Sequence, residues 1–101
     1  KPTQEEVSLC MPFLRRQIEI INPAVLVMLG DPSTKALLGT TQGITMTHGK
    51  WFSFSAPDLA RTIPAIPMFH PAYLLRSPQQ KRLAWHDWLS LKRKLTELGV
   101  L

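Results

Sequence analysis

The sequence predicts an α/β fold with a short parallel sheet, and three observations lead to this prediction. The segment 24–29 is apolar throughout and is bounded by Pro23 and Gly30, which is typical of a buried parallel strand. The segment 63–69 is also strand-like, and a helical pattern begins after it at Ser77. The chain has 101 residues, of which 45% are hydrophobic, so we expect one domain with a modest core, or a piece of one.

The residues before the first strand predict two helices. Thr3 and Glu6 form a capping box, which predicts a short helix from there to about Cys10. Pro12 would clash with the carbonyl four residues before it, so we expect a second helix to begin at Pro12 and to end at Ile21. The expected buried stripe of this helix consists of Phe13, Leu14, Ile18 and Ile21.

The strand at 24–29 is expected in the centre of the sheet, because it is apolar on both faces. A short helix should follow it, with Asp31 as its N-cap, Pro32 at its first position and Gly39 at its end. A strand, a glycine turn and a helix N-terminus offer backbone N–H groups to an anion. An ordinary strand-to-helix connection has the same pattern, so both interpretations remain open.

The region between the two strands is expected to form a hairpin, with short strands at 44–46 and 51–54 around the turn 48–50. The second strand contains Pro64 and Pro67, whose nitrogen atoms cannot donate to a ladder. We therefore expect this strand to be short or to lie at a sheet edge.

The C-terminal part of the chain predicts one long helix. A second capping-box pattern at 77–80 precedes it, and the helix should run to about Leu98, before Gly99. The stripe expected on one side of this helix consists of Trp85, Trp88, Leu91 and Leu95.

The charge of the chain is concentrated in its second part. The formal net charge is +5, and residues 61–101 hold seven Lys and Arg against two acids, whereas the rest is neutral. A basic half suggests a polyanionic partner, of which nucleic acid is the commonest. A solvated, lysine-rich helix face explains the charge equally well.

Cysteine content and hydropathy restrict the cellular context. Cys10 is the only cysteine, which excludes an internal disulfide framework and favours a reducing compartment such as the cytoplasm. No apolar run approaches the length of a membrane span, so no membrane partner is expected. Because the chain starts at Lys1 on a capping signal and without a methionine, we expect further sequence upstream.

The segment 70–76 says most about function. It places His70, Pro71, apolar side chains and Arg76 directly after the C-terminal end of the second strand. Open α/β sheets bind ligands where strands pass into helices, so the segment is a candidate site for a nucleotide flipped out of its duplex. On residue type alone, however, such a histidine is more often a structural hydrogen-bonding residue, and the leucines are core residues by default.

Six motifs follow one another along almost the whole chain, and the histidine segment is the most specific of them. They lie at 2–10, 12–14, 25–30, 35–39, 49–52 and 70–76. In this order they resemble the C-terminal half of a family 4 uracil-DNA glycosylase, the bacterial and archaeal iron–sulfur type.

The resemblance implies an α/β/α sandwich around a short parallel sheet, of which residues 1–101 would form the C-terminal half as a single domain fragment. It also implies that the complete protein removes uracil from DNA by hydrolysing the N-glycosidic bond. Negative charge gathers on the uracil ring as this bond breaks, so a hydrogen-bond donor near a carbonyl oxygen lowers the barrier. His70 fits this catalytic role.

The same resemblance implies a set of DNA contacts. An enzyme that extrudes a nucleotide needs an apolar wedge to fill the vacated stack, and Leu74, aided by Tyr73 or Leu75, is the expected wedge. Arg76 is expected to hold a phosphate. The full set of expected DNA-contacting residues is Pro71, Tyr73, Leu74, Leu75 and Arg76, with Lys50 and His48 as phosphate contacts from the hairpin.

Two features depart from the family pattern. The family binds a [4Fe–4S] cluster through four cysteines, and Cys10 matches the last of them, so the cluster is expected only in the complete protein. In this chain Cys10 is expected to be a small buried residue. The family's N-terminal acidic motif, which carries the group for the attacking water, is also absent. We therefore predict that this polypeptide alone does not release uracil and that its unpaired strand edges favour self-association.

Three functional hypotheses remain at this point. The first is a fragment of a uracil-DNA glycosylase. The second is a non-catalytic DNA-binding or scaffold domain of the same fold, associated with a polymerase. The third is an unrelated small α/β module that binds a phosphorylated metabolite through residues 30–34.

Overall fold

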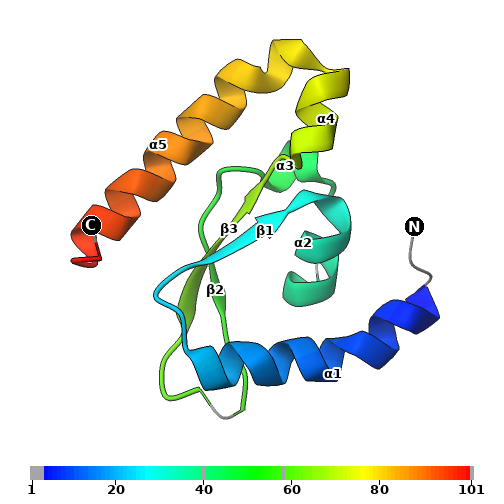
Figure 1. Ribbon diagram of the computed structural model, residues 1–101, viewed down its shortest axis with the longest axis vertical. Helices are drawn as coiled ribbons and strands as arrows, with labels where there is room; N and C mark the ends of the chain where they lie inside the picture. The colour runs from blue at the N-terminus through cyan, green and yellow to red at the C-terminus, as the bar shows by residue number, and fades with distance from the viewer. Residues whose placement is uncertain (1–3, 40, 58, 101) are drawn as a thin grey trace.

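A computed structural model describes residues 4–39, 41–57 and 59–100. Its three strands form one sheet in the order β1-β3-β2, in which β1 is parallel to β3 and β2 is antiparallel to it (Figure 1). The elements are α1 (Gln4–Ile21), β1 (Leu26–Leu29), α2 (Gly30–Leu38), α3 (Ile44–Thr47), β2 (Phe52–Phe54), β3 (Ile63–Met68), α4 (Pro71–Arg76), a 3-10 turn (Pro78–Gln80) and α5 (Lys81–Glu97).

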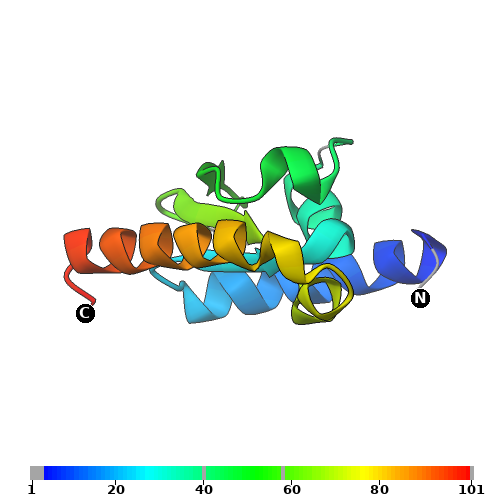
Figure 2. The same ribbon diagram turned by 90° about the horizontal axis from the view of Figure 1, so that it is seen from above.

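Helices cover both faces of this sheet. On one face, Ile18 of α1 packs with a buried cluster from all three strands, and leucines of α2 border this cluster. On the other face, Ile66 and Met68 of β3 pack against Leu91 of α5. The arrangement can be followed in Figures 1 and 2, where α5 and α2 lie on different sides of the strands. The predicted α/β fold, a partial three-layer sandwich, is confirmed, although the sheet is mixed rather than purely parallel.

The N-terminal region is one helix, and the prediction of two helices was wrong. Pro12 lies inside α1 on its exposed side, where water can satisfy the carbonyl that proline leaves without a donor. Of the predicted stripe, Ile18 is 5% exposed, whereas Phe13 is 75% and Ile21 is 72% exposed. α1 therefore touches the sheet near its C-terminal end. The predicted capping residue Thr3 lies outside the described residues.

The positions of the two longer strands are the reverse of those expected. β1 lies at a sheet edge, and β3 is the central strand of six residues. Its prolines are tolerated because each lies where only one neighbouring strand pairs with β3: Pro64 faces β2, and Pro67 faces β1. Gly49 donates to the carbonyl of Pro67 beyond the end of β2, and Pro64 precedes the first β1–β3 pair, in which Leu26 faces Ala65.

The predicted hairpin is not present. Residues 44–47 form the short helix α3, and β2 pairs with β3 instead, with Phe54 opposite Ile63. The first N–H group of α3, that of Ile44, donates to the side chain of Asp31. This long-range bond, which satisfies a free helix N–H group, favours a helix where the sequence alone suggested a strand.

The long helix α5 is present as predicted, but its buried side is rotated. Ala84, Asp87 and Leu91 are the buried residues, whereas Trp85 is 63% and Trp88 is 51% exposed. Asp87 turns inward because it pairs with His48. Within the described residues, no helix combines the length and apolar character needed to cross a membrane.

Candidate functional site

A cleft of about 380 Å³ opens at the carboxyl ends of β1 and β3. Because these strands are parallel neighbours, the residues that follow them meet at one edge of the sheet, where open α/β sheets bind ligands. The cleft is lined by the β1–α2 turn, by Ile44 of α3 and by the segment after β3. Its lining residues are Leu29, Gly30, Asp31, Pro32, Ser33, Ile44, Phe69, His70, Tyr73 and Arg76.

Gly30 allows the two walls of the cleft to approach one another. Its φ angle is +85°, and a Cβ atom there would lie 3.4 Å from the Cβ atom of His70. A side chain at this position would be strained by the positive φ angle, and its Cβ atom would be in van der Waals contact with the histidine. The carbonyl of Gly30 accepts a hydrogen bond of 2.9 Å from the buried hydroxyl of Thr34, which fixes the turn.

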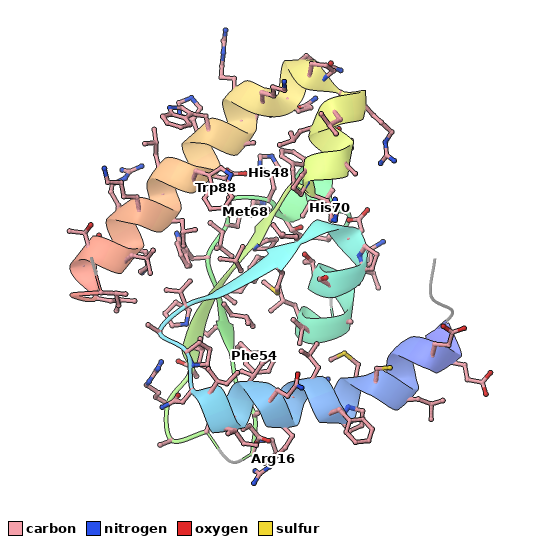
Figure 3. All side chains as sticks on the ribbon, viewed as in Figure 1. Arg16, His48, Phe54, Met68, His70 and Trp88 are labelled. Carbon is pink, nitrogen blue, oxygen red and sulfur yellow. The ribbon has the colours of Figure 1, made fainter. Side chains whose placement is uncertain are left out.

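His70 lies at the edge of the cleft as the N-cap of α4 (Figure 3). Its Nδ1 accepts a hydrogen bond of 3.1 Å from the backbone N–H of Ala72. A neutral imidazole has one donor and one acceptor nitrogen, so this bond places the proton on Nε2. The exposed ring of His70 therefore has an N–H donor, on the nitrogen that is not used by the cap.

The helix α4 separates the predicted wedge residues by their exposure. Tyr73 and Leu74 pack against the buried cluster of Ile44, Phe69 and Ala84. Leu75 is 78% exposed and thus is the most accessible of the three predicted wedge residues. Pro71 and Arg76 are exposed as well, and Arg76 in the last turn of α4 lines the cleft.

Asp31 does not cap α2, because that helix begins one residue earlier at Gly30. Its carboxylate instead accepts the N–H group of Ile44 at the start of α3. A free helix N–H group is a good partner for a carboxylate, which explains why the side chain turns away from its own helix. Asp31 thereby connects α3 to the β1–α2 turn.

The two predicted phosphate contacts outside the segment 70–76 have different environments. Lys50 is exposed after the turn at Gly49. His48 turns inward: its side chain is 18% exposed, and its Nδ1 lies 2.8 Å from Oδ2 of Asp87. This nitrogen therefore binds Asp87 of α5. The sequence had predicted that His48 is a surface residue that contacts a phosphate.

Asp87 is a buried acid that the sequence did not reveal. It is 7% exposed and lies three residues after Ala84 and four before Leu91, both of which are buried. That spacing places an acid on the buried side of a basic helix, and it was the only feature of the sequence that could have indicated a buried Asp87. Its partner could not be inferred, because His48 lies 39 residues earlier.

Cys10 is exposed, whereas the sequence predicted a buried residue. It borders a hollow between α1 and α2. The contact of α1 with the buried core lies near the C-terminal end of the helix, at Ile18. The described residues contain no group of three or more His, Cys, Asp or Glu side chains that would hold a metal ion. A [4Fe–4S] cluster needs four thiolates, and a chain with one cysteine does not fit this requirement by itself.

The chain is similar to known proteins over most of its length. The model of the uracil DNA glycosylase superfamily matches residues 1–89. The chain is 31% identical to the type-4 uracil-DNA glycosylase of Sulfurisphaera tokodaii, over 98% of the chain and 44% of that relative. It is 39% identical to the type-4 uracil-DNA glycosylase of Thermotoga maritima, over 85% of the chain and 44% of that relative.

A relative of another kind is a DNA polymerase of Bacillus phage SP01. The chain is 30% identical to it over 77% of the chain and 8% of the polymerase. The chain spans less than half the length of the curated glycosylases it matches.

Proposed function

Because this chain belongs to the uracil DNA glycosylase superfamily, we propose that the complete protein excises uracil from DNA by hydrolysing the N-glycosidic bond. The proposal concerns the whole protein, since the chain covers 44% of the S. tokodaii relative. Membership of this superfamily removes the hypothesis of an unrelated metabolite-binding module.

The observation that carries this proposal is the hydrogen bond from Ala72 N–H to His70 Nδ1. It leaves the proton on Nε2, so a neutral His70 presents a fixed donor at the cleft. Such a donor stabilises the negative charge that develops on a uracil carbonyl oxygen as the glycosidic bond breaks. His70 thus acts as the electrostatic catalyst supplied by this chain.

The exposed side of α4 acts on the DNA around the flipped nucleotide. Leu75 is the principal wedge, because it is the most exposed of the three candidates, and Tyr73 and Leu74 support it from the packed side of the helix. Arg76 and Lys50 bind phosphates. Both are exposed, and Arg76 lines the same cleft as His70.

Two functions of the complete protein require residues that this chain lacks. The water that attacks the sugar needs an acidic group. Among the described residues Asp31 is the one acid that lines the cleft, and it already binds the N–H of Ile44. A [4Fe–4S] cluster in the complete protein would take Cys10 as one of its four ligands, and the exposure of Cys10 leaves its thiol accessible.

A second candidate function is a non-catalytic DNA-binding or scaffold domain beside a polymerase. The similarity to the phage DNA polymerase favours it. The two functions differ in one measurement: a scaffold domain binds DNA but does not release uracil.

The test is single-turnover uracil release by the complete protein from an oligonucleotide with one uracil. His70→Ala should lower the rate about 100- to 1,000-fold, the usual loss for one oxyanion donor. His86→Ala, at an exposed position of α5, is the matched control and should leave the rate unchanged. DNA binding without any uracil release by the unaltered protein would support the scaffold function instead.

A further inference from the structure

The turn formed by His48 and Gly49 lies between α5 and the strand that leads to His70. On one side, His48 faces the carboxylate of Asp87 at 2.8 Å, and because an ionised carboxylate only accepts, Nδ1 of His48 is the donor. On the other side, the N–H group of Gly49 donates to the carbonyl of Pro67 at 2.8 Å. The turn is therefore fastened to both elements.

The ring of His48 also contacts the residue directly before His70. The ring centroids of His48 and Phe69 are 4.4 Å apart, with an interplanar angle of 30°. Phe69 is 5% exposed, and the ring of Tyr73 stacks on it at 5.1 Å. His48, Phe69 and Tyr73 thus form a column of rings that includes the residue directly before His70 and the residue three positions after it.

We propose that Asp87 and His48 are positioning residues for His70. Asp87 fixes the ring of His48, that ring fixes Phe69, and Phe69 with Tyr73 sets the direction in which the His70 imidazole enters the cleft. The inference rests on the proposed function, because the task of the pair is to orient a catalytic group. Neither residue of the pair lines the cleft, so both act through Phe69.

The kinetic test compares Asp87→Ala, His48→Ala, the double variant and Asp87→Asn in the complete protein. Each disruptive variant should lower kcat about 10- to 100-fold, the loss expected when a catalytic group is displaced by about 1 Å. KM should change less than about threefold, because substrate contacts are kept, and the double variant should lose no more than the single ones. Asp87→Asn keeps an acceptor oxygen and should retain most of kcat, and His86→Ala is the control.

A spectroscopic test works without activity. The amide proton of Ala72 and the ring nitrogens of His70 report the bond between them, so both NMR signals should shift in Asp87→Ala and stay in place in His86→Ala. A folded Asp87→Ala protein with unchanged kcat and unchanged signals would overturn the proposal. The double variant, which leaves no buried charge unpaired, serves as the test if a single variant does not fold.

The two proposals fail in distinguishable ways. If the unaltered protein releases no uracil, the proposed function fails, and the NMR signals alone decide the positioning role. If the protein is active but Asp87→Ala lowers only its thermal stability, the pair is a structural contact and the inference fails.

Discussion

The backbone of Gly49 lies against the carboxylate of Asp87, so that a Cβ atom on residue 49 would be 2.2 Å from Oδ1. The φ angle of Gly49 is +74°, a backbone conformation that residues other than glycine rarely adopt. Gly49→Ala should therefore lower the free energy of unfolding of the complete protein by about 2–4 kcal/mol, from strain and overpacking together.

The matched control for this substitution is Gly39→Ala. Gly39 has a similar φ of +69°, but a Cβ atom there would meet nothing within 4 Å. Urea unfolding should show a loss of only about 1 kcal/mol for the control. Equal losses in the two variants would show that the contact with Asp87 has no energetic weight.

Leu74 and Leu75 are neighbours with different environments, and their alanine variants should separate packing from DNA intercalation. Leu75→Ala removes an exposed side chain, so the melting temperature should not change, while uracil release from duplex DNA falls about tenfold. Leu74→Ala should lower the free energy of unfolding by about 1–3 kcal/mol, because this residue packs against the cluster around Phe69. The opposite pattern would make Leu74 the wedge.

Arg76 should contribute one phosphate contact. In fluorescence anisotropy with labelled DNA, Arg76→Gln should weaken binding and reduce the slope of log K against log[salt] by about one. Arg93→Gln removes the same charge from an exposed position on α5 that does not line the cleft, and it is the control. An identical salt dependence for both variants would assign the effect to net charge rather than to the cleft.

The 101-residue polypeptide by itself should release no uracil, because Asp31, the acid that lines the cleft within the described part of the chain, already binds the N–H of Ile44. The measurement is single-turnover release from a single-stranded oligonucleotide, which removes the need for base flipping. Detectable release that disappears in His70→Ala would show that the chain supplies its own water-activating group.

The sequence predicted those parts of the fold that depend on local patterns. The apolar run before Gly30, the strand before His70 and the long C-terminal helix all have signals within a few residues. The segment 70–76 was singled out from its local pattern as well, and His70, Tyr73 and Arg76 of this segment line the cleft. The six-residue helix α4 was missed, because its N-cap is a histidine rather than one of the usual capping residues.

The incorrect predictions concern contacts between distant residues. The side chain of Asp31 binds the backbone of Ile44, which converts an expected strand into a helix. Asp87 binds His48, which turns an acid inward and leaves Trp85 exposed. Hydrophobic periodicity treats every acid as a surface residue. A buried acid that is hydrogen-bonded to a distant residue therefore changes which side of a helix is buried, without any local signal.

The outer flank of β1 has a further consequence. Among the described residues β3 alone pairs with this strand, so every second amide and carbonyl of β1 points away from the sheet, beside the partly exposed Val27 and Leu29. Unpaired amides and carbonyls at a sheet edge form main-chain hydrogen bonds with an added extended segment. This flank is therefore a place at which a further strand would extend the sheet.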